Sequence, residues 1–187
     1  MKNIYSKGFT MIEIVIVIVI AGIIGSMSAN LLYQGAEIYI GETNRQGFVS
    51  ESRSVFWRLM RDAQGQRSPG DFDQSGRETI NLRNAKNISR VFRINSESES
   101  EFEFSLNGSG YNNLSTYLYS NNFYFYDNIF SDITPSTESV LSSTEAETVR
   151  MAKLGLTFKK DTDETLSLSS YIYPINFRFG KKMTYHD

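Results

Sequence analysis

The chain has 187 residues, a formal net charge of −2 and no cysteine. The length suits one domain of ordinary size with a real core, together with an anchoring segment. The charge excludes a strong overall field toward nucleic acid, and the lack of cysteine excludes disulfides, thiolate metal ligands and cysteine nucleophiles. The single histidine, His186, is the penultimate residue, so we expect neither a catalytic histidine nor a histidine-rich metal site.

The amino-terminal segment contains an apolar run long enough to cross a bilayer. Residues 14–32 carry no charge. A helix of that length spans about 28 Å, close to the thickness of the hydrocarbon core. Lys2 and Lys7 precede the run, which predicts a cytoplasmic amino terminus and a remainder that faces the periplasm or exterior.

Three interpretations of this segment are open at this point. A secretory signal would be cut after Ser26-Met27-Ser28-Ala29, whereas a plain single-pass anchor would keep the same span. Neither explains Glu13, because a carboxylate in a membrane helix costs roughly 2.5 to 3.5 kcal/mol at the bilayer centre and less near an interface. A carboxylate in that place is expected to have a partner.

The third interpretation rests on residues 7–13, KGFTMIE, and the uninterrupted apolar run that follows. This stretch closely resembles the signal of type IV prepilins and of type II secretion pseudopilins. The resemblance implies that a prepilin peptidase cuts between Gly8 and Phe9 and methylates the new amino terminus, which makes Phe9 an N-methylphenylalanine. It also implies that Glu13 pairs with this amine on a neighbouring subunit and so sets the axial register of helices in a filament.

The helical pattern continues past the apolar run. No proline occurs before Pro69, and apolar residues recur at helical spacing until Gly65 and the Ser68-Pro69-Gly70 stretch predict an end. We therefore predict one helix from about Phe9 to Gly65. The stripe expected to face the rest of the protein is Phe48, Val55, Phe56, Leu59, Met60 and Ala63.

We expect the chain to divide into three parts. Residues 1–8 form a leader peptide, and residues 9–33 form the half of the helix that lies in the membrane or the filament core. Residues 34–187 form a globular head that includes the amphipathic second half of the helix.

The remainder predicts an antiparallel sheet. Residues 101–106 alternate strictly, with Phe102, Phe104 and Leu106 inward. Residues 96–100 are expected to form a hairpin loop, and residues 127–147 a flexible surface excursion. Further strands are predicted at 88–94, 116–120, 123–126, 154–158 and 166–172, with turns at Asn121-Asn122 and at 161–164.

A long amino-terminal helix followed by antiparallel strands is the order of the α+β pilin fold that the resemblance implies. Residues 56–62, FWRLMRD, are similar to the same region of minor pilins and pseudopilins of the J and W types, and of a minor pilin of mannose-sensitive haemagglutinin pili. The paired cysteines and the helix proline of many major pilins are absent here. Both departures favour a minor subunit.

The resemblance then implies a structural function. We expect a minor pilin-like subunit, stored as a single-pass inner-membrane protein, that helps to initiate or cap a type IV pilus. Its expected partners are other major and minor pilins, the prepilin peptidase and the inner-membrane assembly platform. The alternatives are a type II secretion pseudopilin of the J type and, from another class, a pilus-borne adhesin or DNA-binding module.

The sequence contains two weaker signals. Asp71, Asp73, Ser75 and Gly76 match the first half of a calcium loop, but Leu82 stands where the bidentate glutamate belongs, so we expect a solvated turn and no metal cofactor. Residues 53–93 hold nine Arg or Lys residues, whereas residues 94–148 hold nine acids and no base. This asymmetry favours complementary subunit faces, and without interleaved aromatics we expect no nucleic-acid partner.

The sequence contains no Gly-x-Ser-x-Gly motif, no phosphate-binding loop and no metal-spaced His or Cys cluster. We therefore expect no enzymatic activity and no small-molecule substrate.

Overall fold

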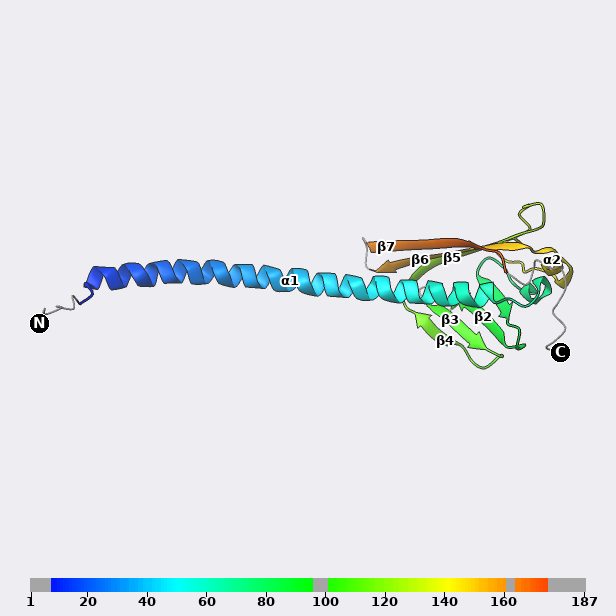
Figure 1. The fold of residues 1–187 in the computed structure, drawn as a ribbon, viewed down its shortest axis with the longest axis horizontal. Helices are drawn as coiled ribbons and strands as arrows, with labels where there is room; N and C mark the ends of the chain where they lie inside the picture. The colour runs from blue at the N-terminus through cyan, green and yellow to red at the C-terminus, as the bar shows by residue number, and fades with distance from the viewer. Residues whose placement is uncertain (1–7, 96–100, 161–163, 175–187) are drawn as a thin grey trace, which may run out of the picture. The chain divides into compact units, whose positions relative to one another are not determined.

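The computed structural model describes residues 8–95, 101–160 and 164–174. The chain divides into two compact units, residues 1–46 and 47–187, and helix α1 crosses the boundary between them (Figure 1). The elements are α1 (Met11–Gln64), the 3-10 helix η1 (Pro69–Phe72), β1 (Thr79–Arg83), β2 (Ser89–Ile94), β3 (Phe102–Leu106), β4 (Asn112–Ser115), β5 (Leu118–Tyr126), α2 (Ser143–Thr148), β6 (Met151–Lys160) and β7 (Glu164–Ile172).

The carboxyl-terminal part of α1 belongs to the second unit and forms one wall of its core. Every member of the predicted stripe is buried, and Ser52 joins it as a small residue on the same face. The buried positions are one, three or four residues apart and repeat about once per turn, so they fall on one side of a helix with 3.6 residues per turn. The predicted helix and its buried face are both confirmed.

Two antiparallel sheets complete the second unit. One sheet has the strand order β1-β2-β3-β4 and the other β5-β6-β7. Phe92 lies opposite Phe104 in the first sheet, and Leu156 lies opposite Leu168 in the second. Alternation places the side chains of β6 in turn inside and outside, which gives the burial of Ala152, Leu154, Leu156 and Phe158. The α+β, pilin-like architecture is confirmed.

The predicted turn at Asn121-Asn122 is wrong, because both residues lie within the continuous strand β5. Asn121 pairs with Leu156 and Asn122 with Gly155. The amide of the largely buried Asn121 donates to the backbone carbonyl of Glu78 at 2.9 Å. A side chain at Gly155 would meet the Asn122 carbonyl oxygen at 3.3 Å, so the glycine lets the two strands approach closely there. Tertiary partners therefore override the turn preference of asparagine.

Residues 127–147 lie largely at the surface, as predicted, but two of their side chains anchor the segment in the core. Leu141 and Ala146 are fully buried, and α2 packs against η1. Ser142 begins α2 with a capping box, in which its hydroxyl accepts from the Glu145 amide and the Glu145 carboxylate accepts from the Ser142 amide. Leu106 also differs from the prediction, since 39% of it is exposed at the end of β3. The predicted loop at 96–100 and the predicted tip of the last hairpin, 161–163, lie outside the described residues.

Candidate functional site

The three residues before α1 are open to their surroundings. Gly8, Phe9 and Thr10 are all exposed and lie outside the helix. No atom lies within 4 Å of the place where a side chain at Gly8 would begin. Phe9 is 82% exposed. The predicted cleavage bond between Gly8 and Phe9 is therefore accessible in the described chain, as a protease substrate must be.

The first turn of α1 is closed by a reciprocal contact between Thr10 and Glu13. The Thr10 amide and hydroxyl donate to Oε2 of Glu13 at 2.7 and 2.8 Å. The Glu13 amide lies 3.4 Å from the Thr10 hydroxyl oxygen. This is a capping box, which satisfies amide groups that have no partner inside the helix. Glu13 thus has a partner within its own chain as well as the one expected on a neighbour.

Sequence reasoning missed this role of Thr10. The available signal was the spacing Thr-x-x-Glu immediately before an apolar helix. The capping box occupies Oε2, and an added cation can still approach the carboxylate. The structure places Gly8, Phe9 and Glu13 in one short stretch at the start of α1. Their roles in cleavage, methylation and register stay predictions.

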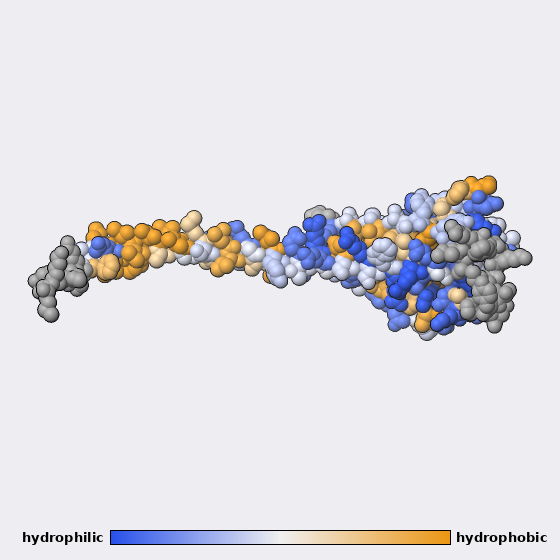
Figure 2. Space-filling model, in the orientation of Figure 1, coloured by the Kyte–Doolittle hydropathy of each residue, from blue (hydrophilic) through white to orange (hydrophobic). Residues whose placement is uncertain are grey.

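The side chains of the apolar run of α1 are exposed along its whole length. Every residue from 8 to 47 is exposed. Figure 2 shows apolar surface over most of the amino-terminal part of this helix. Among the described residues, α1 is the one helix that is long and apolar enough to cross a membrane. An apolar helix of this kind needs lipid or other protein around it, because water would surround the side chains otherwise.

These features agree with one protein family. Residues 4–29 match the family described as the prokaryotic N-terminal methylation motif. The amino-terminal segment is that of a type IV prepilin-like protein. The match covers residues 4–8 of the predicted leader, the candidate cleavage bond, Glu13 and most of the apolar run, and it supports a pilin or pseudopilin anchored by its amino-terminal helix. No curated protein matches the chain.

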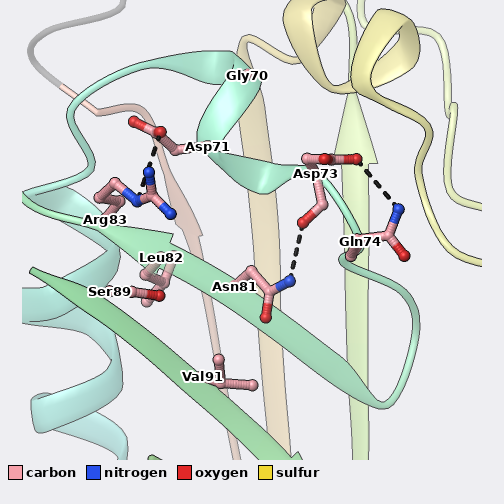
Figure 3. Close-up of a pocket in the computed structure, with 9 residues that line it drawn as sticks. All are labelled: Gly70, Asp71, Asp73, Gln74, Asn81, Leu82, Arg83, Ser89 and Val91. Atoms are coloured by element: carbon pink, nitrogen blue, oxygen red, sulfur yellow. Dashed lines mark hydrogen bonds and ion pairs between the residues drawn. The ribbon is translucent and has the colours of Figure 1, made fainter. Parts of the chain in front are cut away.

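The calcium-like stretch lies beside a polar cavity of about 300 Å³ in the second unit (Figure 3). Asp71 is paired with Arg67, which donates to both carboxylate oxygens at 2.9 and 3.0 Å. Asp73 instead accepts from Gln74, and the two carboxylates point in different directions (Figure 3). In the described part of the chain no three acidic or histidine side chains converge for a metal. The Arg67–Asp71 pair joins η1 to the segment that connects it to α1.

The basic stretch 53–93 is partly neutralised inside the second unit. Arg90 donates to Asp62 at 2.8 Å, and Arg93 to Glu103 at 3.0 Å. Burial raises the pKa of Asp62 above its ordinary value, and the Arg90 guanidinium opposes this shift. The asymmetry seen in the sequence is therefore an overestimate of the surface charge, because several arginines already have partners.

Proposed function

We propose that this protein is a minor, non-enzymatic subunit that helps to initiate or cap a type IV pilus. The peptidase removes residues 1–8 and methylates Phe9. The processed chain is then stored as a single-pass inner-membrane protein with a cytoplasmic amino terminus and a periplasmic head. The assembly platform later adds it to a filament. The capped carboxylate of Glu13 receives the methylated amine of a neighbour and selects the register.

One observation carries this proposal: the methylation motif, exposed from Gly8 onward, leads directly into an apolar helix whose residues are exposed as far as residue 47. The same segment suits lipid before assembly and the packed helices of a filament afterwards. Gly22 and Gly25 support packing in a filament. No atom lies within 4 Å of the place where a side chain would begin at either position, and small residues of this kind let helices pack closely. The change from lipid to helix contacts requires no refolding of the head.

The minor role is supported by the departures from the pattern of major pilins. The chain has no cysteine, and α1 runs without a proline from Met11 to Gln64. The head forms its core without a disulfide, from seven phenylalanines that are almost fully buried and their neighbours: Phe48, Phe72, Phe92, Phe102, Phe123, Phe125 and Phe158. A subunit present in few copies supports an assembly without having to form its shaft.

The deciding experiment combines processing with assembly. Mass spectrometry of the mature protein should find Phe9 as a methylated first residue. Deleting the gene should lower the number of filaments per cell, with no change in filament width. A mature start at Asn30 would restore the secretory-signal interpretation, and filaments built mainly of this chain would make it the major subunit.

The pseudopilin alternative predicts a different phenotype from the same deletion. Loss of a type II secretion pseudopilin should retain secreted proteins in the periplasm and leave surface pili unchanged. A pilus-borne adhesin or DNA-binding module would instead leave filament number intact and remove attachment or DNA capture. Filament number, protein secretion, and attachment or DNA capture, all measured in the same deletion strain, therefore separate the three functions.

A further inference from the structure

A protruding loop of the second unit displays two large apolar side chains. Residues 127–132 connect β5 to the segment that leads to α2, and the loop extends beyond the sheet β5-β6-β7 (Figure 1). Ile129 is 76% exposed and Phe130 is 70% exposed. The apolar surface at this tip is visible in Figure 2. Exposed aromatic anchors of this kind are enriched where proteins bind each other.

The loop is held in one conformation by its own hydrogen bonds. Oδ1 of Asp127 accepts from the amides of Ile129 and Ser131, both at 2.9 Å. The Asp127 amide donates to the Ser131 carbonyl, and Tyr126 forms a bridge with Asp132. Phe130 has a φ of 61°, a left-handed conformation that is unusual for an aromatic residue. Strain at a rigid tip that faces water suggests a role in binding.

The second unit also contains a cavity with complementary chemistry. It has a volume of about 230 Å³, and α1, β2 and β3 line it. Its apolar part is formed by Phe104 and Leu106, the latter being the strand residue left exposed. The Arg58 guanidinium lies 4.3 Å from the centre of the Phe104 ring. The residues that line the cavity are Arg58, Arg61, Asp62, Arg90, Phe104 and Leu106.

The cavity has an excess of positive charge. Three guanidinium groups line it, and Asp62, which is paired with Arg90, is the one carboxylate among the described residues of its lining. The loop has the opposite charge, because Asp127 and Asp132 flank its apolar tip. An aromatic side chain that enters the cavity would meet Phe104 and an arginine face, and the flanking acids would meet the cationic rim.

We propose that the loop 127–132 of one copy docks into the arginine-rimmed cavity of a second copy, with Phe130 as the anchor. This proposal rests on the proposed function, because it names one contact between heads in the assembly. The loop and the cavity lie on opposite sides of the second unit: the loop is beyond β5-β6-β7, and the cavity is on the side of β2 and β3 (Figure 1).

Opposite placement determines what the contact builds. Two heads cannot each insert their loop into the cavity of the other at the same time. The contact is therefore head-to-tail, and it leaves a free loop at one end and a free cavity at the other. Such an interface stays open at both ends instead of closing into a dimer. A few copies joined in this way would present an ordered row of heads on which a filament can begin.

Cysteine crosslinking of the full chain tests the contact, because the natural sequence contributes no background thiol. Asn128→Cys places a thiol beside the anchor, and Leu106→Cys places one in the cavity. Oxidised membranes that contain both variants should yield disulfide-linked dimers, and a chain with both changes should yield a ladder of multimers. The matched control pairs Asn128→Cys with Tyr119→Cys, which is exposed on β5 away from the cavity, and should give no product.

A second change tests the anchor itself. Phe130→Asn retains a residue that accepts a left-handed backbone but removes the ring, and should lower the crosslinking yield by roughly tenfold. Equal yields with the Tyr119→Cys control, no product at all, or dimers from Asn128→Cys alone would each overturn the proposal. If Gly8 cleavage and filament incorporation persist without the crosslink, the docking fails and the proposed function stands; loss of incorporation with the crosslink intact would show the reverse.

Discussion

The two parts of α1 differ in what covers them, although one unbroken helix contains both. Over residues 11–46 apolar side chains point in every direction and none is buried. Over residues 47–64 most apolar side chains form one stripe in the core, and Trp57 is the large one left exposed. The backbone geometry is the same in both. The distribution of apolar residues around the helix therefore decides whether its cover comes from its own head or from lipid and neighbouring subunits.

The largest expected effect separates two adjacent residues of the second part. Phe56 is 7% exposed and Trp57 is 66% exposed. In the fragment 34–187, Phe56→Asp should abolish the cooperative thermal transition, since burying a carboxylate in place of a ring costs about 4 kcal/mol or more. Trp57→Asp is the matched control and should change the unfolding free energy by about 0.5 kcal/mol or less. A folded Phe56→Asp fragment would mean that this face of α1 does not form the core.

The next effect concerns the first part of the helix and affects assembly more than folding. Glu13→Val should leave membrane insertion and cleavage intact, because it makes the segment more apolar. Its incorporation into filaments should fall by about tenfold, the factor that corresponds to about 1.4 kcal/mol of lost pairing. Quantitative immunoblots of sheared filaments and of membranes measure the ratio.

Thr10→Ala is the control that separates capping from register. It removes the hydroxyl side of the capping box and retains the carboxylate, so incorporation should stay near that of the natural protein. Equal losses in Thr10→Ala and Glu13→Val would assign Glu13 to the helix start alone.

The sequence predicted the parts of the fold in which one signal repeats. Apolar residues repeat at helical spacing at many positions of α1, and apolar and polar residues alternate at many positions of the hairpin β6–β7. The turn at Asn121-Asn122 failed because the Glu78 carbonyl that binds Asn121 is 43 residues away along the chain. No local sequence pattern predicts a phenylalanine with a positive φ, so the conformation of the loop around Phe130 could not be predicted. At the amino terminus, Gly8, Phe9 and Glu13 followed from a short motif, and the Thr-x-x-Glu spacing could have predicted the contact of Thr10 with Glu13 as well.

A smaller effect tests the polar contact that joins α1 to β2. Arg90→Ala should destabilise the head by about 2 kcal/mol at neutral pH, because it leaves the largely buried Asp62 carboxylate without its ion pair. Arg93→Ala is the control. It removes the Arg93–Glu103 ion pair, both of whose side chains are more exposed than those of Arg90 and Asp62, and should therefore cost less stability. Urea unfolding of both variants against the unchanged head measures the difference.

The pH dependence of this effect has a definite sign. Burial raises the pKa of Asp62, so the folded protein binds a proton there more tightly than the unfolded chain does. The charged form therefore costs stability above the raised pKa, and this cost disappears as the pH falls through the raised value toward the ordinary aspartate pKa. The deficit of Arg90→Ala should shrink over the same interval. A deficit that stays constant down to about pH 4 would show that the lost interaction is packing.

The smallest effect concerns the capping box of α2. Ser142→Ala removes a hydroxyl that both accepts from the Glu145 amide and donates to its carboxylate, and should cost about 1 kcal/mol. Ser143→Ala is the control, because it lies one residue inside the helix. The loss should reach the global transition, since Leu141 and Ala146 tie α2 to the core. The amide and hydroxyl of Ser142 lower the pKa of Glu145, so this contribution is present above the ordinary glutamate pKa and is lost as the pH falls through the lowered value. The unfolding curves of the two variants should therefore lie closer together at acidic pH than at neutral pH, with a remainder from the bond of the Glu145 amide to the Ser142 hydroxyl. Curves that stay equally separated would show that the Glu145 charge has no part in the cap.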